Sequence, residues 1–148
     1  MARMIWRSTV SDREKSQTCM FDNAAPQILV VEDVEETRDG IERLLKADGY
    51  LVDPARDEED AVVRAKRARP HLILLSVGAP VADTILTASR IREDSGLSDD
   101  VPVVIFCVEE IAEGAEVETK GEIYLTRPDN FDQLRRFLRQ LLGRRARS

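Results

Sequence analysis

The sequence lacks the features that mark secreted and membrane-spanning proteins. Its 148 residues include only two cysteines, Cys19 and Cys107, which are too few for a disulfide framework and favour a reducing compartment. No apolar run approaches the roughly 20 residues that a transmembrane helix needs. Residues 1–17 also lack the apolar segment of a secretory signal. We therefore predict a cytoplasmic protein without membrane contact.

Acidic residues outnumber basic residues in the body of the chain. The formal net charge is −6, and the acidic excess lies within residues 27–142. Proteins that bind nucleic acids cluster Lys and Arg to neutralise phosphates, so this balance argues against a nucleic-acid partner. We interpret the short basic tail, residues 143–148, as a solvated chain end.

Three regions follow from the pattern of polar and apolar residues. Residues 1–26 are polar and without periodicity, which predicts a flexible N-terminal extension, and Met20 within it is an alternative start. Residues 27–142 are long enough to bury one core and are predicted to form one domain, followed by the basic tail.

Strands and helices are predicted to alternate from Gln27 onward. Apolar runs at 28–32, 50–54, 71–76, 102–107 and 122–126 indicate strands. The second run alternates and contains Pro54, which is typical of a sheet edge. Helical spacing of apolar residues predicts helices at 35–47, 57–68, 82–93 and 130–142.

The inward faces of these helices are also predicted from the spacing. The expected core residues are Ile41, Leu44, Leu45, Ala61, Val62, Ala65, Ala68, Ile85, Leu86, Ala88, Ile91, Phe131, Leu134, Phe137, Leu138, Leu141 and Leu142. Segment 109–118 is the weakest helix candidate, because five glutamates crowd it and Gly114 interrupts it. Five βα units in series predict an α/β fold, a doubly wound parallel sheet with right-handed crossovers.

Polar residues follow four of the predicted strands. They are Glu32 and Asp33, Ser76, Cys107 and Arg127. The carboxyl ends of parallel strands meet at one edge of the sheet, where ligands of such folds bind. The sequence therefore predicts one site built from these four strand ends.

The chain resembles the receiver domain of two-component response regulators over residues 27–142. The matching text is ILVVED at 28–33, RPHLILL at 69–75, Pro80, DDVPVV at 99–104 and YLTRP at 124–128. The resemblance implies a flavodoxin-like (βα)5 sheet with strand order 2-1-3-4-5. It also implies a site where acidic residues hold Mg²⁺ and an aspartate after the third strand accepts a phosphoryl group from a phosphohistidine.

Three defining positions differ from that pattern. Glu32 and Asp33 match the acidic pair, but Ser76 stands at the phosphoacceptor position, Cys107 at the Thr/Ser position and Arg127 at the Lys position. A serine forms no aspartyl phosphate and needs a base to become a nucleophile. It also removes one carboxylate from the metal cage, so we expect Mg²⁺ binding at Glu32 and Asp33 to be weak or absent and no other cofactor.

One hypothesis about the altered site is an internal ion pair. Glu32 and Asp33 are adjacent like charges, and a cation at Arg127 would compensate them in place of the metal. Tyr124 matches the aromatic residue that members of the family switch between exposed and buried states. Whether it switches here or is fixed in one rotamer stays open.

The predicted function is an atypical, stand-alone receiver domain that is not an enzyme and signals by protein–protein contact. The partner, a kinase, a regulator or a second copy, is expected on the face formed by residues 109–142, which begins with glutamates and ends with Arg135, Arg136 and Arg139. An alternative is a switch phosphorylated on Ser76 or another hydroxyl by a Ser/Thr kinase. An enzyme on the same sheet is disfavoured because no glycine-rich phosphate loop and no nucleophile beside a histidine are found.

Overall fold

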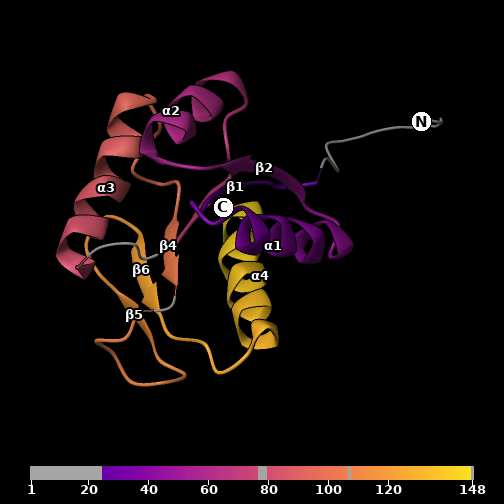
Figure 1. Ribbon diagram of the computed structural model, residues 1–148, viewed down its shortest axis with the longest axis vertical. Coiled ribbons are helices and arrows are strands. Elements are labelled where there is room, and N and C mark those ends of the chain that lie inside the picture. Colours follow the sequence, from indigo (N-terminus) through magenta and orange to yellow (C-terminus); the bar gives the residue numbers. More distant parts are fainter. Residues whose placement is uncertain (1–24, 77–79, 107, 148) are drawn as a thin grey trace.

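The short apolar runs of the sequence form one sheet with helices on both faces (Figure 1). The computed structural model describes residues 25–76, 80–106 and 108–147, with side chains described up to Gly143. The predicted N-terminal extension lies almost wholly outside these residues. The elements are β1 (Gln27–Val31), α1 (Glu35–Ala47), β2 (Leu51–Ala55), α2 (Glu58–Arg67), β3 (Leu72–Ser76), α3 (Val81–Asp94), β4 (Val103–Phe106), β5 (Glu116–Glu118), β6 (Ile123–Thr126) and α4 (Phe131–Arg147).

The order of the strands is β2-β1-β3-β4-β6-β5. The first five strands of this order pair in parallel, and β6 is the strand expected as the fifth. The predicted order 2-1-3-4-5 and the α/β class are therefore confirmed. The predicted edge position of the strand with Pro54 is confirmed as well.

The fourth βα unit contradicts the expected pattern. No helix forms within residues 108–118; the chain turns there and then adds β5, which pairs antiparallel with β6. Gly114 has a φ of +84°, in the left-handed region that ends helices. The glutamates of this segment also repel one another at helical spacing, which disfavours a helix there.

Each face of the sheet has its own apolar core. Successive residues of the central strands point to opposite faces, and helices cover both faces. Leu29 and Val31 of β1 pack on the side of α2 and α3, whereas Ile28 and Val30 pack on the side of α1 and α4. Figure 1 shows these two helix pairs on opposite sides of the strands. A strand buried on both faces accounts for the unbroken apolar runs that predicted it.

Three predicted core residues are exposed instead. Leu44 is 47% exposed and Leu86 is 56% exposed, and Ala68 lies on the surface just after α2. Leu44 and Leu86 each neighbour the residues that define the buried stripe, such as Leu45 and Ile85, but point about 100° away around the helix. The stripes facing the sheet are therefore narrower than expected.

The helix ends follow local signals with one exception. Asp57 caps α2, since its carboxylate accepts a hydrogen bond from the Asp60 N–H at 2.8 Å. Helix α4 extends to Arg147 instead of ending at 142. No helix in the described part of the chain is long and apolar enough to cross a membrane.

Candidate functional site at the carboxyl ends of the strands

The parallel register brings Glu32 and Ser76 to the same level of the sheet. Val31 of β1 pairs with Leu75 of β3, so the residues that follow each are neighbours across the strands. Ser76 in turn lies beside Phe106, the last residue of β4. Cys107 comes next but lies outside the described residues, so its predicted place in the site is not tested.

Glu32 and Asp33 have different surroundings although they are adjacent. Glu32 is only 7% exposed, and its Oε2 accepts a hydrogen bond from the Val34 N–H at 3.0 Å. Its carbonyl accepts one from Arg38 Nη1 at 2.8 Å. Val34 is the N-cap residue of α1 and has no capping side chain of its own, so the carboxylate of Glu32 takes that role near the positive end of the helix dipole. Asp33 is exposed to solvent.

Ser76 is the last residue of β3 and is half-buried. It offers a neutral hydroxyl at the position where the resemblance noted in the sequence predicts an aspartate. A neutral hydroxyl oxygen binds Mg²⁺ more weakly than a carboxylate does, because Mg²⁺ sites rely on one or two charged oxygen ligands in octahedral geometry.

The residues at this edge do not fit a Mg²⁺ ion well. The described residues contain no group of three or more Asp, Glu, His or Cys side chains that are placed to hold a metal ion. One oxygen of Glu32 is already engaged by the N–H of Val34, which leaves Asp33 as the free carboxylate of the pair. We therefore assign no metal-dependent step to the described residues at this edge.

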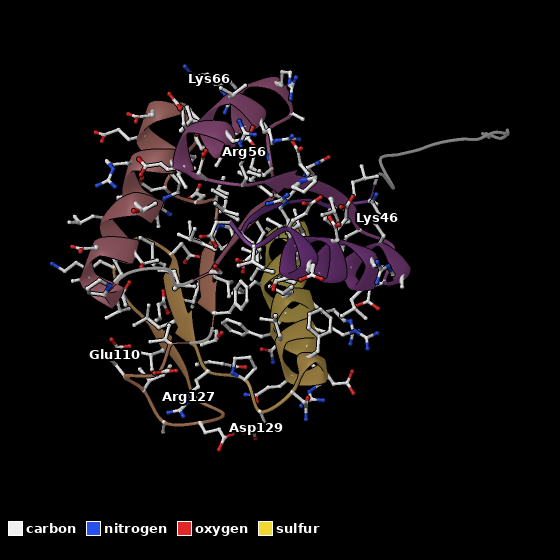
Figure 2. The ribbon with its side chains drawn as sticks, in the orientation of Figure 1. Lys46, Arg56, Lys66, Glu110, Arg127 and Asp129 are labelled. Atoms are coloured by element: carbon white, nitrogen blue, oxygen red, sulfur yellow. The ribbon has the colours of Figure 1, made fainter. Side chains whose placement is uncertain are left out.

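Arg127 turns away from the acidic pair, and the predicted ion pair is wrong. Its Nη1 donates to the carbonyl of Ile111 at 3.1 Å and to that of Glu109 at 3.3 Å. Within the described residues it forms no ion pair with Glu32 or Asp33. Figure 2 shows Arg127 in the lower part of the molecule, in the same region as Glu110 and Asp129.

The missing helix explains where Arg127 points. In a helix, the carbonyls of residues 109 and 111 would accept main-chain hydrogen bonds from residues four positions later. Here the chain is irregular, and the guanidinium of Arg127 supplies those bonds instead. The main chain of Arg127 adds two more bonds to this segment, through Gly114 N–H and Ala115 C=O. No local sequence pattern indicates this role of Arg127, because it depends on the loss of the helix.

Tyr124 is buried, with 4% of its surface exposed. Its ring packs edge-to-face on Phe137 of α4, with the ring centroids 5.5 Å apart and the planes at 80°. Its hydroxyl donates to Glu122 Oε1 at 2.9 Å. The inward rotamer is the one present in this structure.

The face built from residues 109–142 contains a groove between β5 and α4. Two adjoining hollows of about 690 and 480 Å³ share Glu116, Phe137, Arg139 and Gln140. Arg136 lines the larger hollow and Glu118 the smaller one. Glutamates thus lie on the strand wall and arginines on the helix wall of this groove.

Arg135 does not contribute to this groove as predicted. It reaches α1, where Nε donates to Asp48 Oδ2 at 2.7 Å. The hydrogen bond from Arg135 holds the pKa of Asp48 below its ordinary value despite partial burial, and Asp48 raises the pKa of Arg135. Arg135 therefore joins α4 to α1.

Comparison with known proteins identifies the group to which these features belong. A model of the response regulator receiver domain matches residues 28–139. The transcriptional regulatory protein PrrA of Mycobacterium leprae is 29% identical over 125 residues, which cover 83% of this chain and 52% of PrrA. This chain thus spans about half the length of the curated relatives that it matches.

Two solved structures show the same fold. The receiver domain of the sensor histidine kinase PA1611 from Pseudomonas aeruginosa, which has magnesium in its active site cleft, is 28% identical with a TM-score of 0.60. That match covers 81% of this chain and 99% of the other. The anti-anti-sigma factor PhyR from Bartonella quintana is 25% identical with a TM-score of 0.64, covering 85% of this chain and 51% of PhyR.

Proposed function

This chain belongs to the family of response regulator receiver domains, and on that premise we propose that it signals by binding a protein partner without phosphorylation at the family's acceptor position. Its relatives are response regulators of two-component signalling. Receiver domains serve as signalling modules, so the proposal assigns no enzymatic reaction to this chain. That it acts in the cytoplasm and without an attached output domain stays a prediction.

The single observation that carries the proposal is Ser76 at the end of β3, level with Glu32. Phosphoryl transfer from a phosphohistidine to this position would need a carboxylate to form the acyl phosphate, and a serine hydroxyl does not become a nucleophile without a base. The position of Arg127 supports the same proposal. Its guanidinium binds main-chain carbonyls of residues 109 and 111 and is not directed to the acidic pair.

The direct test is incubation of the full chain with Mg²⁺ and acetyl phosphate, or with Mg²⁺ and beryllofluoride. We expect no increase in intact mass and no Mg²⁺-dependent chemical-shift changes around Asp33. The matched variant is Ser76→Asp, which restores the missing carboxylate and is expected to gain a Mg²⁺ response at the same residues. Stoichiometric modification of the wild-type chain would overturn the proposal.

The phosphorylated-serine alternative needs a different measurement. Intact-mass analysis of the protein purified from its own host, compared with a Ser76→Ala variant, reports any phosphoryl group on this hydroxyl. The half-buried position of Ser76 at a strand end limits the access of a kinase. We therefore expect the two masses to differ only by the substitution.

The kind of partner follows from the comparisons as part of the proposal. PhyR is named an anti-anti-sigma factor and PrrA a transcriptional regulatory protein. Both names are consistent with a role in which a receiver domain contacts another regulator. We place the partner on the face formed by residues 109–142, where the groove between β5 and α4 lies.

A further inference from the structure

Within the described residues, the outer edge of β5 has main-chain groups without a hydrogen-bond partner. In the β5–β6 pair, the Thr119 N–H bonds to the Ile123 carbonyl and the Ala115 carbonyl accepts from the Arg127 N–H. Alternate residues of an antiparallel strand bond to the same neighbour, so the main-chain groups of Glu116 and Glu118 point away from β6. β5 is the last strand of the sheet on this side. Two N–H and two C=O groups therefore face outward, where another strand would pair.

The side chains of β5 define what such a strand would have to carry. Glu116 and Glu118 lie on one face of the strand, and Val117, which is 41% exposed, lies on the other. Residues 109–118 contain five glutamates and no lysine or arginine. Glu116 and Glu118 form no ion pair within the described part of the chain. Opposite charges directly across a strand pair stabilise it, and like charges destabilise it.

We propose that the outer edge of β5 binds an extended, basic segment of a partner protein by strand addition. Basic residues two positions apart lie opposite Glu116 and Glu118, and the apolar residue between them lies beside Val117. Main-chain hydrogen bonds supply affinity in this kind of recognition, and the alternating side chains supply specificity. The proposal rests on the proposed function as a protein-binding module and names the chemistry of its partner.

A second copy of this chain is a poor occupant for the same edge. Antiparallel pairing of two β5 strands about a two-fold axis would set the glutamates of the two copies against one another. The charge that discourages self-association would attract a basic strand. Edge strands are commonly protected from pairing with each other by charged side chains.

Two arginines on α4 reduce the electrostatic attraction between the β5 edge and basic side chains of a partner. Arg136 and Arg139 of α4 line the opposite wall of the groove on the same face as Glu116. A basic residue of the bound strand would be attracted by the glutamates of β5 and repelled by the arginines of α4. Arg139→Glu should therefore strengthen binding of a basic strand, and we expect at least a threefold gain in affinity at low salt.

The test is a titration of the full chain with a blocked peptide of alternating lysine and valine, followed by amide chemical shifts and hydrogen exchange. We expect shifts at residues 115–119 and new exchange protection at the Glu116 and Glu118 amides. A peptide of the same composition with its lysines contiguous is expected to bind at least tenfold more weakly. Equal binding of the two peptides would mean charge attraction without strand pairing and would overturn the proposal.

A pair of variants at position 118 distinguishes the contribution of main-chain hydrogen bonds to binding from that of the side-chain charge. Glu118→Gln removes the carboxylate and keeps the outward N–H, whereas Glu118→Pro removes both. Proline at an edge position that faces away from the sheet leaves the β6 ladder intact. We expect Glu118→Pro to bind at least tenfold more weakly than Glu118→Gln. Equal affinities of the two variants would overturn strand addition.

Two controls complete the design. Glu113→Gln changes the charge of the same segment outside β5 and is expected to alter affinity less than twofold at moderate salt. Light scattering of the wild-type chain should give a monomer, and a dimer that Glu118→Pro dissociates would make the second copy the occupant and refute the proposal. Binding is measured without Mg²⁺ or phosphodonor, so its failure is distinguishable from failure of the proposed function.

Discussion

The two edges of the sheet are protected in different ways. At the β2 edge, Leu51 N–H and Ala55 C=O bond toward β1, so Pro54 faces outward, where its missing N–H removes a donor. At the β5 edge the outward N–H groups of Glu116 and Glu118 are kept, and charge is the only protection. Proline removes one outward donor from the β2 edge for any incoming strand, whereas the glutamates at the β5 edge disfavour acidic strands above all. Under the proposal above, the β5 edge therefore remains open to basic strands.

The arginines near the two edges also differ in what they bind. Near β2, Arg64 donates to the carboxylates of Asp53 at 2.7 Å and Asp60 at 3.1 Å. Near β5, Arg92 and Arg127 donate to main-chain carbonyls. Regular βαβ geometry at the first edge leaves few carbonyls unpaired. At the second edge, Arg127 satisfies carbonyls of segment 109–118, which forms no helix. Arg92 satisfies carbonyls of the loop before β4 and of the turn between β5 and β6.

Among the variants near the two edges, Arg92→Met is expected to reduce the free energy of unfolding most. Arg92 is 5% exposed, and its Nη1 donates to the carbonyls of Asp99, Val101 and Gly121, at 3.1, 3.0 and 2.5 Å. It thereby ties the turn between β5 and β6 to α3. Methionine keeps the apolar stem and loses these bonds, so we expect the free energy of unfolding to fall by about 2 kcal/mol. Urea unfolding followed by circular dichroism measures the change.

Arg90→Met is the matched control for that variant. Arg90 lies two positions earlier on α3, is exposed and bonds the carboxylate of Glu58. Its replacement should change the free energy of unfolding much less than Arg92→Met does, because exposed ion pairs contribute little. If both variants lose equal stability, the turn beside β5 does not depend on its buried arginine.

A smaller effect is expected from Arg127→Ala. The half-buried guanidinium bonds the carbonyls of Glu109 and Ile111, so its loss should cost about 1 kcal/mol. The loss should be local, with faster amide exchange in residues 109–115 and little change at β2. Arg136→Ala, on the exposed side of α4, is the control and should leave this exchange unchanged. Uniformly faster exchange across the sheet would contradict a local role.

Much of the fold could be predicted because it depends on local pattern. Unbroken apolar runs located four of the five parallel strands, and the alternating run with Pro54 located the fifth and identified an edge. The start of α2 also agrees with local chemistry, since Asp57 is a residue type favoured at helix N-termini and caps the helix. These signals are contained in a few consecutive residues, so tertiary contacts did not override them.

The rest of the site depends on contacts between distant segments. The direction of Arg127 follows from carbonyls left unpaired when segment 109–118 does not form a helix, and no local pattern encodes that. Nothing in the local sequence distinguishes Arg92 from other polar residues of α3. Its burial depends on the loop before β4 and the turn between β5 and β6, which both contact it. A signal for β5 was present, however, in the alternation of Glu116, Val117 and Glu118.

The smallest effect is a difference in acid sensitivity between the edges. Burial raises the pKa of Asp60, but the Arg56 N–H and the Arg64 guanidinium outweigh it and hold that pKa below its ordinary value. A carboxyl whose pKa is lowered by folding stabilises the fold above its unfolded pKa of about 4 and loses that contribution as pH falls. Arginine–carbonyl bonds near β5 contain no group that titrates in this range.

Acidification from pH 7 to 3 should therefore loosen the β2 edge before the β5 edge. We expect the protection factors of the Arg56 and Ala61 amides, corrected for the pH dependence of intrinsic exchange, to fall by a factor that corresponds to about 0.5 kcal/mol, while that of the Thr119 amide changes less. Asp60→Asn should remove most of this pH dependence at the β2 edge, because an amide does not titrate. Parallel loss of protection at both edges, with one midpoint, would mean that acid acts on the whole fold and that the two kinds of arginine contact do not differ in this way.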